Sequence, residues 1–279
     1  MNDFADWLQN EGKQPNTVKR YKIVANEFTN WIEKKNKIPF NPTIITTKEV
    51  LEWVAFLSKN NKESTIKNKV ICIRSYLKYL NEVEGRELRI DEIYFTSDTK
   101  VNTLHFLNEK DKSLLLKFIN DKSSFQKNHW LFYRNKAIIT IMLYGGLRAS
   151  EVINLRVSDI NKGSIRVREN YGIKERSVSV NQEMKQHITE WITERAKRNS
   201  LTDRLFTSKK NVPLTYSGIR HLFDAISKQI GIECLTSQTL RHTFCKVLIE
   251  LGYSIEEVAK LAGHSDLSIT RRYEEELKN

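Results

Sequence analysis

Apolar residues recur at helical spacing through the first hundred residues of the chain. Segments 17–35, 46–59 and 64–80 each carry them at intervals of three and four, which gives every segment one continuous apolar face. No stretch of this region alternates with the period of two that is typical of strands. The pattern predicts a domain of four or five helices over residues 1–95.

The helical periodicity is lost between residues 94 and 103. The sequence there, YFTSDTKVNT, gathers Ser, Thr, Asn and Asp residues, a composition typical of a linker. We therefore expect a linker over residues 96–103 and a second domain over residues 104–279.

The second domain combines helices with one short β-like region. Residues 135–155 are almost all apolar, which predicts a buried helix that a glycine pair interrupts at residue 145. Residues 163–170 and 175–180 alternate with period two, so we expect a hairpin or small sheet. Helical patterns resume from residue 181. The expected fold class is mainly α, with a small β-sheet in the second domain.

Composition argues against a membrane protein, a secreted protein and a zinc site. No apolar run approaches the ~18 residues of a membrane span, and the N-terminus does not have the pattern of a secretory signal. Cys72, Cys234 and Cys245 are few, odd in number and widely spaced, which favours free, buried thiols in a reducing cytoplasm. No set of Cys and His residues supplies four zinc ligands, so we expect no metal.

The charge of the chain points to a polyanionic partner. The formal net charge is +12 and the pI is about 9.5. Most of the excess lies in residues 99–279, which contain 30 basic and 20 acidic side chains. Nucleic acid is the expected partner, and an anionic membrane surface is the weaker alternative.

Three clusters combine glycine or polar residues with arginine or histidine: GGLRASE from residue 145, QTLRHTF from residue 238 and GHSDLSITRRY from residue 263. Arg148 follows the end of a buried helix, where a guanidinium cannot remain without a partner. A salt bridge to Glu151 would satisfy it. Alternatively, Arg148 and Arg241 converge on an oxyanion such as phosphate, which guanidinium groups bind through two parallel hydrogen bonds. The residues alone leave both interpretations open.

The three clusters together resemble the boxes of the tyrosine recombinase, or phage integrase, family. GLRASE is similar to its first arginine box, LRHTF to its second, and LAGHSDLSITRRY to its histidine box followed by a tyrosine. More loosely, the N-terminal pattern of Thr17, Tyr21, Phe28 and Trp31 resembles the helical, SAM-like DNA-clasping domain of the family. The resemblance covers nearly the whole chain.

The resemblance implies site-specific cleavage and rejoining of duplex DNA, without ATP or metal, for integration, excision or resolution of cointegrates or dimers, as in mobile elements and transposition. Tyr273 would attack the phosphodiester and form a 3′-phosphotyrosine. Arg148 and Arg241 would hold the charge of the transition state, and His264 would contact the phosphate or assist proton transfer.

Two positions depart from the family pattern. Gln238 stands where the family commonly has histidine, and an amide can bind phosphate but cannot shuttle a proton. The lysine that protonates the leaving group in the family would be Lys174, which aligns a few residues late. In supporting roles we expect Glu151 to orient an arginine and His242 to buttress its helix.

The C-terminal residues also scan as a helix-turn-helix, with residues 265–273 as recognition helix, so a binding-only DNA regulator is the alternative function. For the enzyme, the resemblance implies a homotetramer on two DNA sites, formed from protomers that are monomeric or weakly associated when free. It would act in the cytoplasm, associated with the nucleoid when bound to DNA.

Overall fold

The computed structural model describes residues 1–95, 104–125, 129–169 and 174–278. The chain divides into two compact units, Met1–Asn102 and Thr103–Asn279, and each is described by itself. The linker expected over residues 96–103 lies outside the described residues.

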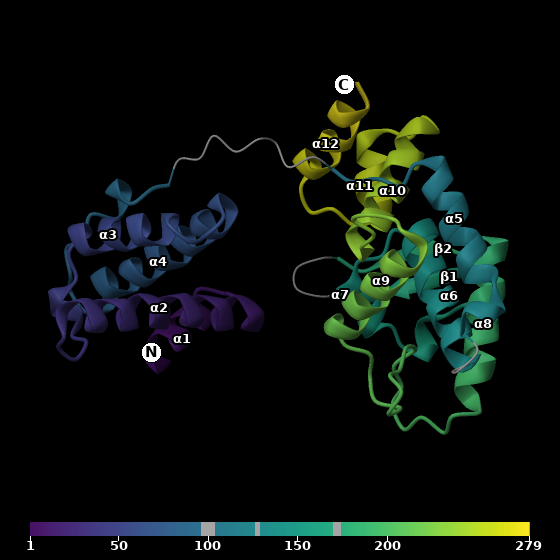
Figure 1. The fold of residues 1–279 in the computed structure, drawn as a ribbon, viewed down its shortest axis with the longest axis horizontal. Helices are drawn as coiled ribbons and strands as arrows, with labels where there is room; N and C mark the ends of the chain where they lie inside the picture. Colours follow the sequence, from purple (N-terminus) through teal and green to yellow (C-terminus); the bar gives the residue numbers. More distant parts are fainter. Residues whose placement is uncertain (96–103, 126–128, 170–173, 279) are drawn as a thin grey trace. The chain divides into compact units, whose positions relative to one another are not determined.

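The first unit is a small helical bundle whose apolar faces meet in one core (Figure 1). Prolines and capping residues set several ends: Pro15 occupies the first turn of its helix, and Thr46 with Glu49 forms a capping box. The rings of Phe28 and Trp53 lie edge to face in the core, with centroids 5.2 Å apart. Its helices are α1 (Asn2–Asn10), α2 (Pro15–Asn36), α3 (Thr47–Ser58) and α4 (Glu63–Val83), with the short 3-10 turns η1 (Pro42–Ile44) and η2 (Ile90–Glu92).

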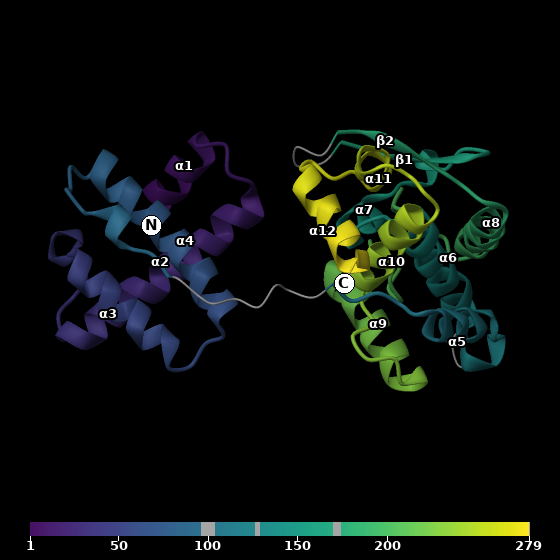
Figure 2. The same cartoon turned by 90° about the horizontal axis from the view of Figure 1, so that it is seen from above.

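In the second unit, helices surround one buried helix, α6 (His129–Gly145), against which α8 (Gln182–Ala196) and α10 (Ser237–Glu250) pack (Figures 1 and 2). Helix α6 is buried along most of its length, as its nearly continuous apolar sequence predicts. The other helices are α5 (Glu109–Asn120), α7 (Ala149–Asn154), α8 (Gln182–Ala196), α9 (Tyr216–Ile230), α10 (Ser237–Glu250), α11 (Ile255–Ala262) and α12 (Leu267–Lys278), with 3-10 turns η3 (Lys122–Phe125) and η4 (Val157–Asp159).

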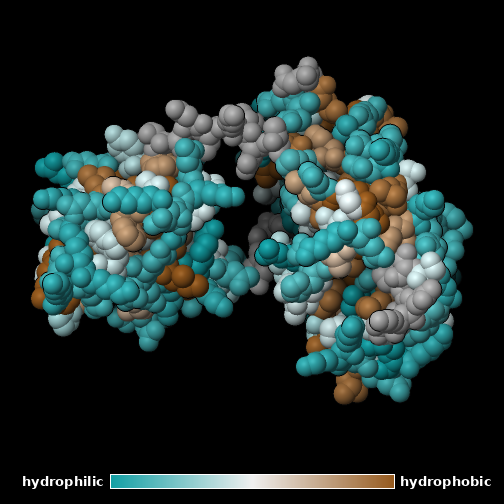
Figure 3. Space-filling model, in the orientation of Figure 1, coloured by the Kyte–Doolittle hydropathy of each residue, from teal (hydrophilic) through white to brown (hydrophobic). Residues whose placement is uncertain are grey.

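One antiparallel pair of strands forms the sheet, β1 (Ser164–Val167) and β2 (Arg176–Ser179). Ile165 lies opposite Val178, and both side chains are buried in the core of the second unit. The mainly helical fold with a small two-stranded sheet confirms the predicted fold class. On the face shown in Figure 3, hydrophilic residues cover most of the surface of each unit.

One prediction about the cysteines is wrong. All three are free, and Cys72 and Cys245 are buried as expected, but Cys234 is exposed. It lies in the turn between α9 and α10 with a positive φ of 56°. This position is not on the apolar face of a helix, so its side chain is not carried into the core. Among the described residues, no helix is long and apolar enough to cross a membrane, and no group of three His, Cys, Asp or Glu residues could hold a metal ion.

Candidate active site

The three sequence clusters meet at one side of the second unit. Arg148 is the N-cap residue of α7, directly after a turn in which Gly146 has a φ of 62°. A Cβ on Gly146 would lie within 3 Å of the Phe244 ring, so only glycine fits between this turn and α10. Arg241 projects from α10, His264 follows α11, and Tyr273 lies on α12.

A buried carboxylate holds two arginines in place. Glu151 accepts hydrogen bonds from the Arg148 guanidinium at 3.1 Å and from two nitrogens of Arg176 at 2.7 and 3.0 Å. Burial alone would raise the pKa of Glu151. The hydrogen bonds and charge of Arg176, with those of Arg148, outweigh this effect and hold the pKa below its ordinary value. The salt bridge considered from sequence therefore exists, with a second arginine added to it.

The same two arginines fasten the turn that carries His264. Arg148 donates a hydrogen bond to the backbone oxygen of Gly263 at 2.7 Å, and Arg176 donates to that of Leu261 at 3.1 Å. Gly263 has a left-handed φ of 71°, and a Cβ there would meet the Arg176 guanidinium at 2.7 Å. This glycine thus allows the end of α11 to approach the two arginines.

Arg241 is a buried cation with an unused donor. Its side chain donates to the backbone oxygen of Gly146, while its second terminal nitrogen is buried with no hydrogen-bond partner among the described residues. Burial, and then the charge of Arg148, lower the pKa of Arg241 to about 10. The guanidinium therefore stays charged near neutral pH. A buried donor of this kind costs free energy unless an acceptor reaches it, so the arrangement suits an incoming anion.

Tyr273 is buried among the side chains of the site, with 2% of its surface exposed. Its ring stacks on that of His264 at 6.0 Å between centroids and meets the His242 ring edge to face at 5.6 Å. Burial and the neighbouring Cys245 thiol raise the pKa of Tyr273, while the charge of Arg241 acts in the opposite direction. In this state the phenol is a protonated, shielded group.

His264 is neutral in the structure. Burial and the charges of Arg241 and Arg148 lower its pKa to about 3. Its Nδ1 shares a hydrogen bond of 2.8 Å with the Thr270 hydroxyl of α12. A neutral imidazole held in this way can donate or accept one hydrogen bond at its other nitrogen.

The remaining predicted residues lie around this group. Gln238 is exposed and shares a 2.9 Å hydrogen bond with His242, one turn along α10. His242 also contacts the backbone oxygen of His105 at 3.3 Å, so it links α10 to the start of the second unit. Lys174 is exposed at the edge of the hairpin and lines a hollow of about 790 Å³ together with Arg176 and His264.

Sequence reasoning missed two residues of the site. Arg176 was not singled out, although it lies two positions before Val178 and so shares the inward face of β2. Cys245 was considered only as a buried thiol, yet it packs against Tyr273 in a small cluster with Val258 and Ala262. Its position four residues after Arg241, on the same face of α10, was the available signal.

Comparisons with known proteins identify the family of the chain. Residues 105–279 match the phage integrase family. The chain is 29% identical to the TnP I resolvase of Bacillus thuringiensis, over 97% of this chain and 93% of the relative. It is 28% identical to the tyrosine recombinase XerA of Pyrococcus furiosus, over 98% and 88% of the two chains.

Two solved structures share the fold. The XerH site-specific recombinase bound to palindromic difH substrate, in a post-cleavage complex, superimposes with a TM-score of 0.76 at 21% identity, over 92% of this chain and 76% of that one. A lambda integrase (75–356) dimer bound to a COC′ core site superimposes with a TM-score of 0.71 at 16% identity, over 98% and 93% of the two chains.

Proposed function

Because the chain belongs to the phage integrase family and is a site-specific tyrosine recombinase, an enzyme that cleaves and rejoins DNA, we propose that Tyr273 is its nucleophile. The phenolic oxygen attacks the scissile phosphorus, forms a 3′-phosphotyrosine bond and releases a 5′-hydroxyl. A 5′-hydroxyl from another strand then attacks the phosphotyrosine and restores the phenol. The energy of the broken bond is kept in the protein–DNA bond, so the cycle needs neither ATP nor a metal ion.

The observation that carries this proposal is the convergence of Arg148, Arg241, His264 and Tyr273 from four separate elements. The unused donor of Arg241 supplies a hydrogen bond that a non-bridging phosphate oxygen can accept. Two guanidinium groups then hold the charge that develops on the pentacoordinate phosphorus. The binding-only regulator is disfavoured because it gives this buried arginine no ligand.

Tyr273 has to become accessible before it can react. Its 2% exposure keeps the phenolic oxygen from a DNA strand, so DNA binding shifts α12 and opens the contacts with Cys245 and His264. A phosphate on Arg241 also supplies an acceptor close to the tyrosine. Entry of DNA and activation of the nucleophile are thereby coupled.

Lys174 is the general acid in this scheme and protonates the 5′-oxygen as it leaves. Its exposed amine, on the rim of the hollow that His264 also lines, is free to reach a bound strand. Gln238 donates a hydrogen bond to phosphate through its amide, and His242 holds the Gln238 side chain. Glu151 orients Arg148.

Strand exchange between two DNA sites requires four such active sites, which we assign to a homotetramer assembled on DNA from weakly associated protomers. Solved relatives are bound to DNA recombination sites, one of them as a dimer. Residues 274–279 would pack on a neighbouring protomer. If their deletion leaves cooperative assembly on DNA unchanged, this role is wrong.

A covalent-trapping experiment tests the nucleophile. The Tyr273→Phe protein first selects its site from a random duplex library, and that site is then made as a nicked suicide substrate. The wild type should yield a protein–DNA band on a denaturing gel, and Tyr273→Phe should bind the same DNA without yielding it. Selective binding by the wild type without a covalent band under any condition would overturn the proposal.

A modified leaving group tests Lys174. A 5′-bridging phosphorothiolate leaves without being protonated, so it should restore cleavage by Lys174→Ala but not by Arg241→Ala. If the thiolate does not rescue Lys174→Ala, another residue is the acid.

A further inference from the structure

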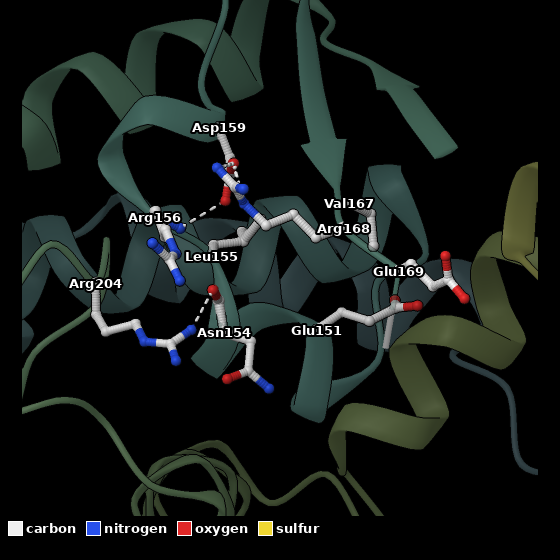
Figure 4. A pocket seen from close by; sticks show the side chains of 9 residues that line it. All are labelled: Glu151, Asn154, Leu155, Arg156, Asp159, Val167, Arg168, Glu169 and Arg204. Atoms are coloured by element: carbon white, nitrogen blue, oxygen red, sulfur yellow. Dashed lines mark hydrogen bonds and ion pairs between the residues drawn. The ribbon is translucent and has the colours of Figure 1, made fainter. Parts of the chain in front are cut away.

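A cavity lined by three arginines and three carboxylates lies beside the active site, and Glu151 stands between the two. It has a volume of about 220 Å³ and is lined from α7, η4, the end of β1 and the loop before α9. Figure 4 shows Asp159 together with the guanidinium groups of Arg156, Arg168 and Arg204 at one end of this cavity, and the side chains of Glu151 and Glu169 at the other. None of these three arginines has a role in the cleavage chemistry described above.

The fold forces two of these arginines together. Arg156 and Arg204 are opposite each other in an isolated antiparallel bridge, which the backbone hydrogen bonds Val157 to Asp203 and Leu205 to Leu155 secure on either side. Directly opposed residues in such a pair project to the same side, and like charges there are destabilising. A ligand of negative charge would relieve this repulsion.

The carboxylates around the cavity differ in what they can offset: Glu151 is already held by Arg148 and Arg176, and Glu169 is exposed to solvent. Asp159 is buried, and it accepts hydrogen bonds from the Arg168 guanidinium at 2.7 Å and from the backbone of Arg156 at 2.9 Å. Asp203 pairs with one terminal nitrogen of Arg156 at 2.9 Å, but its own side chain is 60% exposed. Water screens such an exposed pair and limits its worth.

Hydrogen-bond donors remain available in the cavity. The Nε of Arg156 is buried and has no partner among the described residues. Arg204 donates from one terminal nitrogen to the backbone oxygen of Asn154 at 2.6 Å, and no ion pair of Arg204 with a described carboxylate is present. A phosphate group presents oxygens that accept the parallel hydrogen bonds of a guanidinium.

We propose that Arg156 and Arg204, with Arg168 at the rim, bind a DNA backbone phosphodiester near the scissile one. This inference rests on the proposed function, because it takes the bound duplex as the source of the phosphate. Glu151 lines this cavity and also holds Arg148, so one carboxylate connects the two phosphate sites. A contact of this kind fixes the register of the DNA on the protein without reading its sequence.

The salt dependence of DNA binding tests the site. Each phosphate contact contributes about 0.9 to the slope of log affinity against log salt concentration for duplex DNA. In the Tyr273→Phe background, Arg156→Gln with Arg204→Gln should lower the magnitude of this slope by about 0.9 for one lost contact, measured by fluorescence anisotropy on a fixed duplex. A control, Lys185→Gln on the exposed side of α8 with Lys197→Gln at the C-cap of the same helix, removes the same charge and should leave the slope unchanged.

An unchanged slope in the arginine variant, or an equal fall in the control, would overturn the proposal. If the double variant does not show the thermal transition of the wild type, Arg204→Gln alone is judged by the same criterion. Because Tyr273→Phe cannot form the covalent bond, the slope is measured independently of cleavage. A lowered slope therefore still supports the arginine site if covalent trapping fails.

A neutral-backbone scan identifies the contacted phosphate. Methylphosphonates placed singly around the scissile position should weaken wild-type binding at one position where the arginine variant shows no loss. If the loss of affinity caused by the methylphosphonate adds to the loss caused by the arginine substitutions at every position, a direct contact is refuted. If inorganic phosphate at constant ionic strength raises the Tm of the wild type but not of the variant, and the duplex slope is unchanged, the ligand is a free phosphate and the DNA assignment is wrong.

Discussion

Replacing Glu151 by Gln removes the one charge that two active-site arginines share. The carboxylate accepts four hydrogen bonds, from the backbone and side chain of Arg148 and from two nitrogens of Arg176. Gln keeps the size of the side chain and one acceptor oxygen, but its amide group would face a guanidinium as a second donor. Arg148, Arg176 and Arg241 would then lie together without a compensating charge.

The magnitude follows from how deeply the network is buried. Breaking a buried ion pair by removing one partner costs about 3–5 kcal/mol. The side chains of Glu151 and Arg176 are 4% and 10% exposed, but that of Arg148 is 25% exposed and water screens part of its charge. We therefore expect a loss of about 2–4 kcal/mol. For a unit of this length each kcal/mol lowers the Tm by about 2–4 °C, so the loss lowers it by roughly 4–16 °C.

The pH dependence has a definite sign. The folded-state pKa of Glu151 is held below its ordinary value, so its contribution to stability is fully present above the unfolded pKa of about 4.3. It is lost as the pH falls from there through the folded pKa. The difference in Tm between wild type and Glu151→Gln should stay constant from about pH 7 to 5 and shrink below about pH 4.

Calorimetry of the intact chain measures the transition of the second unit in both proteins. Glu175→Gln is the matched control, because it removes a carboxylate from the exposed Arg166 pair, whose side chains are about half exposed. The control should cost less than about 1 kcal/mol. A Glu151→Gln protein that unfolds within a degree or so of the wild type at neutral pH would refute the reasoning.

Three further predictions concern single residues. Gly146→Ala places a Cβ within 3 Å of Phe244 at a positive φ, so it should lower the free energy of unfolding by more than about 2 kcal/mol. Gly252 also has a positive φ but faces open space, so Gly252→Ala should cost only about 1–2 kcal/mol. A denaturant titration measures both losses. The His264 ring, with a pKa of about 3, should show flat NMR shifts from pH 8 to 5 in the free protein, and an inflection near pH 6.5 would contradict its assigned burial. Cys234 is exposed, whereas Cys72 and Cys245 are buried and burial raises the pKa of both thiols, so in the native state only Cys234 should react rapidly with a thiol reagent. Fast labelling of Cys234→Ser would contradict this, because it would show that a buried thiol is accessible.

The helices were predictable because their local and tertiary signals agree. In α2 the apolar face that the spacing predicts is buried in the structure, apart from Trp31, which is partly exposed at its edge. Ile23 does not belong to that face and is 56% exposed. The buried α6 and its end at Gly145 follow equally from composition, because no polar face was available for solvent. Local spacing carries this information, so one sequence was sufficient.

The candidate site was predictable from motifs but not from physical pattern alone. Spacing could place Arg148 beside Glu151, since they are three residues apart on one helix. It could not place Arg176 there, because that contact spans 25 residues and depends on how the hairpin packs. The burial of Tyr273 was equally hidden, because it depends on α10, α11 and α12 packing together.

The shared carboxylate also makes the arginines energetically dependent on each other, and a double-mutant cycle measures this dependence. Arg176→Gln alone leaves Glu151 with Arg148, and Glu151→Gln alone leaves the two arginines without their shared carboxylate. Removing both side-chain charges takes away the repulsion along with the attraction. The double variant should therefore lose less stability than the two single variants lose together, and the difference should be about 1–3 kcal/mol. Additive losses would mean that Glu151 acts on each arginine separately, and the turn at Gly263 would then depend on Arg148 and Arg176 as independent anchors.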